Sequence, residues 1–201
     1  MYAELANRRA RGKVAAMDER LIELPTDRPA TLVVVADTHS RPDARAADQI
    51  RALAPDAILH AGDIGDLEVL DQLSAIAPVF AVRGNIDLHA PSVPDKLALS
   101  LHRRGAEVVR VFMTHIAVYG PRLLGAARDA AQAARADLIV CGHSHVPFVT
   151  RDGTTAVFNP GSIGPRRFGL PIVFGVIDIG ERLSLRHIDC ETGATWRPPS
   201  G

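Results

Sequence analysis

Seven side chains of this sequence could together hold metal ions. They are two aspartates, one asparagine and four histidines: Asp37, His39, Asp63, Asn85, His115, His143 and His145. Carboxylate and amide oxygens suit Mn and Mg, whereas imidazole nitrogens suit Zn, Fe, Ni and Cu. The Asp-x-His and His-x-His spacings let two side chains of one short loop point to the same side. This pattern indicates a metal site with mixed oxygen and nitrogen ligands.

Each of these pieces also has an ordinary structural explanation. A single histidine after a strand is more often a surface or core residue than a ligand, and Gly-Asp and Gly-Asn dipeptides usually form turns. Gly62, Gly84 and Gly142 precede three of the candidate ligands and permit turns that a β-carbon would hinder. The metal hypothesis therefore depends on the joint occurrence of all the pieces, in this order along the chain.

The candidate ligands come directly after predicted strands. Short apolar or β-branched runs predict strands at residues 31–36, 57–61, 79–82, 107–114 and 138–141. Helices are expected at residues 43–53 and 66–76, so the first half predicts a βαβαβ unit with a parallel sheet. Because ligand sites of α/β sheets lie beyond the carboxyl ends of the strands, one edge could bring all five segments together.

The second half of the chain predicts mostly strands. A hairpin is expected from residues 96–102 and 107–114, followed by an alanine-rich helix at 121–136. Further strands are expected at 148–151, 155–158, 172–179 and 182–188. We therefore expect one α/β domain over residues 29–201.

Residues 1–28 have a different pattern. Apolar residues recur among charges at near-helical spacing: Leu5, Ala6, Ala10, Val14, Met17, Leu21, Ile22 and Leu24. This spacing predicts an amphipathic helical extension that ends before Pro25. The apolar stripe could pack on its own domain or on a second copy of the chain, so a homodimer through this segment is one expectation.

The bulk properties limit the classes of partner. The 23 basic and 23 acidic residues cancel, so no chain-wide field attracts long nucleic acid or an anionic membrane. Residues 1–14 lack the apolar region that a secretory signal needs, so none is expected there, and no apolar run in the sequence approaches the roughly 18 residues of a membrane span. Cys141 and Cys190 form no CxxC pair and no disulfide framework. A cytoplasmic protein that acts on small molecules is expected.

The motifs as a set resemble the signature of the calcineurin-like metallophosphoesterase superfamily. They are Asp37-x-His39, Gly62-Asp63, Gly84-Asn85, His115 and Gly142-His143-x-His145. The small single-domain bacterial and archaeal phosphodiesterase branch is the most similar, since Asn159-Pro160-Gly161-Ser162 and Pro165-Arg166 also look like it. The resemblance covers about residues 31–190 and implies a sandwich of two mixed β-sheets flanked by helices.

The resemblance also implies roles for the ligands. It assigns one metal to Asp37, His39 and His145 and the other to Asn85, His115 and His143, with Asp63 bridging both. Two cations about 3.5–4 Å apart stabilise an attacking oxygen and the charge that develops at phosphorus. A hydroxide that bridges the metals would then hydrolyse a phosphodiester or phosphomonoester. Mn is the metal we expect first, and Fe, Ni and Zn also suit these ligands.

The sequence departs from the family pattern at two places. Many members carry His after the Gly-Asn pair, where it helps to protonate the leaving group, but this chain has Ile86. Asp87 is a candidate replacement. The second departure is His115-Ile116, where the family usually has His-Gly. The predicted catalytic residues are Asp63, Asn85, Asp87 and His115, and the predicted substrate-binding residues are Arg83, Asn85 and Arg166.

A non-catalytic role on the same fold is the main alternative. The family resemblance includes a eukaryotic retromer subunit that acts as a binding scaffold. All seven ligand positions are intact here, which favours an enzyme over a scaffold. A nuclease is a third reading, and the balanced charge argues against long nucleic acid as its substrate. The physiological substrate has no readable signature.

Overall fold

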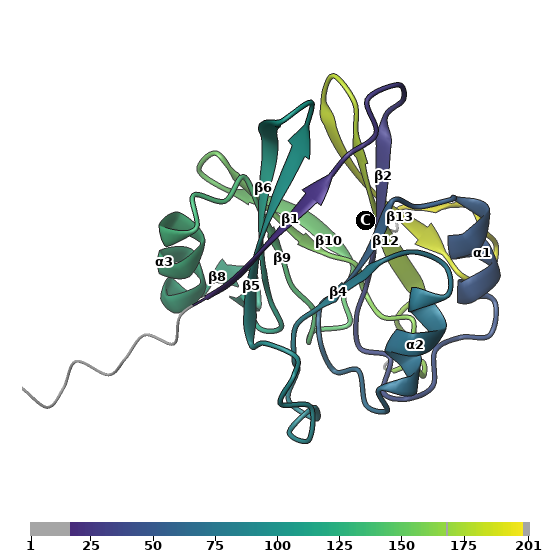
Figure 1. Ribbon diagram of the computed structural model, residues 1–201. Coiled ribbons are helices and arrows are strands. Elements are labelled where there is room, and N and C mark those ends of the chain that lie inside the picture. The colour runs from purple at the N-terminus through teal and green to yellow at the C-terminus, as the bar shows by residue number, and fades with distance from the viewer. Residues whose placement is uncertain (1–16, 168, 199–201) are drawn as a thin grey trace, which may run out of the picture.

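The computed structural model describes residues 17–167 and 169–198. Two six-stranded mixed sheets pack face to face, and helices lie on their outer faces (Figure 1). The strands of the first sheet, in spatial order, are β1 (Asp18–Glu23), β5 (Lys96–Arg103), β6 (Ala106–Thr114), β9 (Leu138–Val140), β11 (Thr155–Asn159) and β10 (Phe148–Asp152). Those of the second are β14 (Thr195–Trp196), β13 (Leu183–Asp189), β12 (Val173–Ile179), β2 (Ala30–Val35), β3 (Ala57–His60) and β4 (Val79–Ala81).

Three helices cover the outer faces of the sheets. Helices α1 (Ala46–Ala52) and α2 (Glu68–Ser74) cover the second sheet, and α3 (Gly125–Ala133) covers the first (Figure 1). A small hairpin of β7 (Val118–Tyr119) and β8 (Arg122–Leu123) precedes α3. None of these helices is long and apolar enough to cross a membrane.

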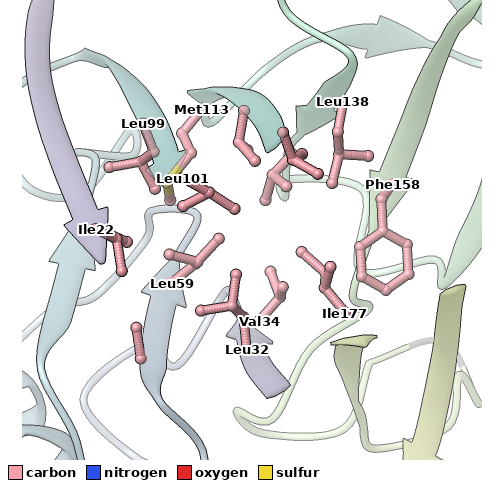
Figure 2. Packing of buried hydrophobic residues seen from close by; sticks show 14 of the residues in the cluster. Ile22, Leu32, Val34, Leu59, Leu99, Leu101, Met113, Leu138, Phe158 and Ile177 are labelled. Carbon is pink, nitrogen blue, oxygen red and sulfur yellow. The ribbon is translucent and has the colours of Figure 1, made fainter. Parts of the chain in front are cut away.

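Strand β2 shows why the central strands are apolar without interruption. Leu32 and Val34 point into the core between the two sheets, whereas Val33 and Val35 pack toward α1 and α2. Strand neighbours alternate between faces, so a strand that is buried on both faces reads as a continuous apolar run. Figure 2 shows the inter-sheet core, where Leu32, Val34 and Leu59 of the second sheet face side chains of the first sheet.

Most of the predicted elements are confirmed. The βαβαβ unit forms β2, α1, β3, α2 and β4, and its three strands are parallel. The predicted hairpin is the antiparallel pair β5–β6, which has a register shift at Leu101/His102. The family-type sandwich of two mixed sheets is therefore the observed fold.

The predicted N-terminal helix is wrong from Asp18 onward. Residues Asp18–Glu23 form β1, which pairs in parallel with β5 along its whole length. Ile22 and Leu24 are buried in the inter-sheet core, and Leu21 is 55% exposed. The apolar spacing of a short segment is compatible with a helix or with a strand. Here the segment pairs with the edge of β5 and is therefore a strand. The domain thus begins before residue 29, and residues 1–16 of the predicted extension lie outside the described residues.

Candidate metal centre

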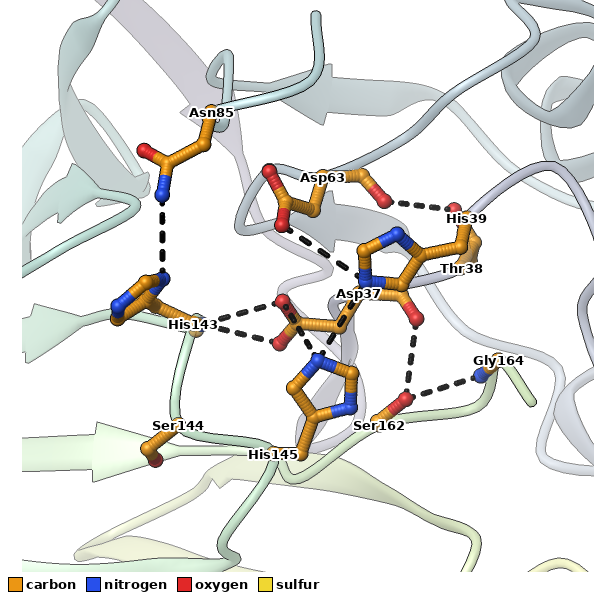
Figure 3. Close-up of polar contacts among 12 residues, drawn as sticks. Asp37, Thr38, His39, Asp63, Asn85, His143, Ser144, His145, Ser162 and Gly164 are labelled. Carbon is orange, nitrogen blue, oxygen red and sulfur yellow. Dashed lines mark hydrogen bonds and ion pairs between the residues drawn. The ribbon is translucent and has the colours of Figure 1, made fainter. Parts of the chain in front are cut away.

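The loops that follow five strands meet where the two sheets adjoin. From the second sheet, the loops after β2, β3 and β4 carry Asp37 and His39, Asp63, and Asn85. From the first sheet, the loops after β6 and β9 carry His115, and His143 and His145. Each of these seven side chains has a polar atom within 3.7 Å of another member of the set. The structure therefore gathers all the predicted ligands at one centre, and Figure 3 labels each of them except His115.

Asp37, His39 and His145 form the first group of candidate ligands. The Nε2 atoms of His39 and His145 are 3.4 Å apart, and His145 Nε2 lies 3.5 Å from Asp37 Oδ1. Burial, followed by the positive charge of Arg167, lowers the pKa of His145 to about 4. His145 is therefore neutral near pH 7 and offers a lone pair. One carboxylate and two neutral imidazoles converging on one point suit a divalent transition metal.

Asp63 faces histidines of both predicted metal sets. Its Oδ1 lies 3.3 Å from His115 Nε2, and its Oδ2 lies 3.7 Å from His39 Nε2. Burial acts to raise the pKa of Asp63. The close contact with His115, the charge of His115 and the amide of Ile86 outweigh burial and hold this pKa well below its usual range. An ionised carboxylate with one oxygen toward each set is what a bridging ligand requires.

His115 carries a buried nitrogen that fits a metal. Its Nδ1–H donates to the carbonyl of Ala61 at 2.8 Å, which leaves Nε2 as the nitrogen that faces Asp63. Within the described part of the chain, this buried Nε2 makes no hydrogen bond. A backbone carbonyl that fixes one imidazole nitrogen while the other points to a metal is a common arrangement. The donor set therefore fits the metals that the family resemblance implies.

Asn85 and His143 complete the set on its open side. Both are exposed, and Asn85 Nδ2 lies 3.4 Å from His143 Nδ1. The amide of His143 donates to both Asp37 oxygens, at 3.2 and 3.0 Å. A second group of mutually close carboxylate and imidazole atoms comprises Asp37, Asp63 and His115. Asp37 thus contributes to both groups of buried ligands.

The backbone at the centre is strained. Of the nine non-glycine residues with positive φ in the described chain, five are candidate ligands: Asp37, His39, Asp63, His143 and His145. Such conformations cost roughly 1–3 kcal/mol each and persist only where surrounding contacts enforce them. Some of those contacts are bonds between the two ligand loops, from Asp37 N to Gly62 O and from His39 N to Asp63 O. Glycine at 84 is also required, because a β-carbon there would lie 2.1 Å from Asp63 N.

Asp87 holds the ligand loops together. It is 3% exposed, and its oxygens accept the backbone N–H groups of Ile64, Gly65 and Gly84 at 3.1, 2.9 and 2.7 Å. If this carboxyl were protonated, its O–H would be a further hydrogen-bond donor placed among three N–H donors. The geometry thus contradicts the predicted role of Asp87 as an acid, and it makes Asp87 a positioning residue.

The two arginines predicted to bind substrate are engaged elsewhere. Arg83 pairs with Asp95, with 2.7 Å between Nη2 and Oδ1. Arg166 donates to the carbonyl of Leu170 and forms an ion pair with Glu191. Neither geometry supports the predicted substrate contact.

Two residues that were not predicted as site residues hold the backbone of the ligand loops by hydrogen bonds. Ser162 Oγ donates to the Asp37 carbonyl at 3.0 Å, and Asn159 Nδ2 donates to the Gly142 carbonyl at 2.7 Å. The Asn-Pro-Gly-Ser motif was the sequence signal for both. Burial lowers the pKa of His60 to about 4. This histidine is fully buried, and its Nε2 contacts Thr38 Oγ1 at 3.0 Å.

The chain belongs to the calcineurin-like phosphoesterase superfamily, whose domain matches residues 31–182. A probable metallophosphoesterase of Methanothermobacter thermautotrophicus is 33% identical, and the match covers 80% of this chain and 92% of that protein. Phosphodiesterase YfcE of Escherichia coli is 32% identical, over 55% of this chain and 59% of its own length.

Solved structures share the fold. Vacuolar protein sorting 29 from Cryptosporidium parvum superimposes with a TM-score of 0.67 at 16% identity, over 85% of this chain and 96% of that one. At this level of identity the similarity concerns the fold alone.

Proposed function

We propose that this protein hydrolyses phosphate esters with two divalent metal ions, preferring phosphodiesters, with Mn as the working metal. The observation that carries the proposal is the convergence of seven candidate ligands, one of which is His115, whose buried Nε2 makes no hydrogen bond within the described residues. The named activity of the Escherichia coli relative supports the phosphodiester preference.

The residues have separate tasks in this proposal. One metal would be held by Asp37, His39 and His145, and the other by Asn85, His115 and His143. Asp63 would bridge the two metals. When bound, the metal pair would polarise the phosphoryl group and lower the pKa of a bound water. The carbonyl of Ala61 and the carboxylate of Asp87 keep the ligand loops in place.

The leaving group must depart without a proton donor at position 86. Ile86 is 45% exposed, and its amide donates to Asp63 Oδ1 at 3.2 Å, so an apolar side chain stands next to the proposed bridging residue. Asp87, the predicted replacement, is committed to three backbone amides. Nitrophenyl esters are therefore suitable probes, because nitrophenolate leaves as a stable anion.

The test is hydrolysis of bis-p-nitrophenyl phosphate and p-nitrophenyl phosphate by metal-stripped protein, before and after Mn is added. We expect Mn-dependent turnover that Asp63→Asn lowers by at least about 100-fold, since it removes a bridging ligand. Asp66→Asn is the matched control. Asp66 lies three residues away and caps the amide of Glu68 at 3.0 Å, a task that asparagine performs equally well.

The opposite outcome would favour a binding scaffold. Absence of turnover with Mn, Zn, Ni or ferrous iron, in folded protein shown to bind metal, would contradict the enzyme proposal. A diesterase would hydrolyse the bis ester faster than the monoester, and a monoesterase would show the reverse order.

We also propose a cytoplasmic protein that acts on small phosphate esters, without long nucleic acid or a membrane as partner. The zero formal net charge and the two buried, free cysteines support this. The predicted homodimer through the N-terminal segment stays a proposal for residues 1–16, which lie outside the described residues, because β1 already pairs within its own sheet.

A further inference from the structure

The segment that starts at Ser162 is fastened to the Asp37 loop. Ser162 Oγ donates to the Asp37 carbonyl, and Gly164 N donates to Ser162 Oγ at 3.1 Å (Figure 3). A β-carbon at Gly164 would lie 2.2 Å from the Asp37 carbonyl oxygen, so only glycine allows this approach. The residues that follow Gly164 are consequently held close to the metal centre.

Two arginines follow at 166 and 167, and they are engaged differently. Arg166 is bound to Glu191 and to the Leu170 carbonyl. Arg167 is exposed, and it lines a small surface pocket together with His145. Among residues 17–167 and 169–198, no acidic side chain forms an ion pair with Arg167. Its guanidinium is therefore available at the edge of the site.

Arg167 lies on one side of the centre. The pocket that it lines includes His145, whose ring stacks on that of His39 with 5.3 Å between the ring centroids. Arg166 lines the same pocket, but Glu191 and the Leu170 carbonyl hold its guanidinium. A cation next to metal ligands opposes the binding of further cations, so Arg167 does not help the protein to take up metals.

We propose that Arg167 binds a phosphate oxygen of the substrate from the His39–His145 side of the centre. A guanidinium presents several N–H donors in a planar fork that matches phosphate geometry, and its bonds to phosphate are charge-assisted. The inference rests on the proposed function, and it replaces the predicted contact from Arg166.

Three variants test the inference on Mn-loaded protein with bis-p-nitrophenyl phosphate. Arg167→Ala should lower kcat/KM by about 10- to 100-fold, the usual effect of losing one charged hydrogen bond. Arg167→Lys should recover part of this loss, because it keeps the charge without the fork. Arg166→Ala is the matched control and should change kcat/KM by less than about threefold, since it removes only an exposed ion pair. Equal effects of Arg166→Ala and Arg167→Ala would overturn the inference.

Calorimetry separates substrate binding from a structural role. Arg167→Ala should bind Mn at least as tightly as the natural protein and should bind inorganic phosphate about tenfold or more weakly. If Mn binding weakened together with phosphate binding, Arg167 would be a support of the loop and the inference would be wrong. A failure of the proposed function can be told apart from a failure of this inference. In the first case the natural protein would show no turnover, and the difference in phosphate binding between the natural protein and Arg167→Ala would still test the role of Arg167.

Discussion

At the scale of the single residue, Asp37 is an acid whose ionisation is disfavoured by its surroundings. It is fully buried, and burial raises its pKa to about 7. The positive charge of His115 lowers this pKa in part, and the negative charge of Asp63 raises it. Below this pKa, a proton on Asp37 neutralises the negative charge that burial disfavours.

This protonation predicts a pH dependence of metal binding. At about pH 6, below its pKa, Asp37 is mostly protonated and must release its proton to bind Mn. His115 adds to the release, because its contacts with Asp63 and the Ala61 carbonyl outweigh burial and raise its pKa. We expect at least about one proton released at pH 6, fewer near pH 8.5, and an affinity that rises between these values. Titration calorimetry in buffers of different ionisation enthalpy measures the release, and a release that is independent of pH would contradict the assignment of Asp37.

At the scale of the element, β1 shows how a local pattern can mislead. The apolar residues in this part of the sequence have near-helical spacing, yet all six residues of β1 pair with β5. Pairing turns Ile22 into the core and leaves Leu21 outside, because neighbouring strand residues point to opposite faces. The N-terminal segment from Asp18 onward is thus a part of the sandwich.

Two adjacent substitutions distinguish the strand from a separate helical extension. Ile22 is 7% exposed, so Ile22→Ala should lower the free energy of unfolding by about 2–4 kcal/mol. Leu21→Ala should lower it by less than about 0.5 kcal/mol, because this side chain is at the surface. Urea denaturation of the two variants measures the difference. If both proved neutral, β1 would not contribute to the folded domain.

At the scale of the whole molecule, the candidate metal ligands come from both sheets. Asp37, Asp63 and Asn85 come from the second sheet, and His115, His143 and His145 come from the first. Metals held between them would cross-link the sandwich at the edge that carries the strained loops. The free energy of metal binding would then add to the stability of the entire domain.

Metal addition should therefore raise the melting temperature. Mn at about 100 times its Kd contributes about 2.7 kcal/mol, which corresponds to about 5–10 °C for a chain of this size. Differential scanning calorimetry with Mn and with a chelator measures the shift. Asp63→Asn should lose most of the shift and Asp66→Asn should keep it. An unchanged melting temperature at saturating Mn would contradict metals that join the sheets.

The sequence alone predicted most strands of the sandwich and the set of candidate ligands, because both have local signals. A strand buried on both faces, such as β2, needs an uninterrupted apolar run, and each cluster of candidate ligands begins after such a run or after a turn-forming glycine. Contacts between distant segments decided the rest. The edge of β5 made residues 18–23 a strand. Three backbone amides from two loops made Asp87 a support rather than an acid, and Glu191 formed an ion pair with Arg166 but not with Arg167 in the described part of the chain. These outcomes depend on which partner lies nearby in space, and the spacing of residues along the chain does not contain that information.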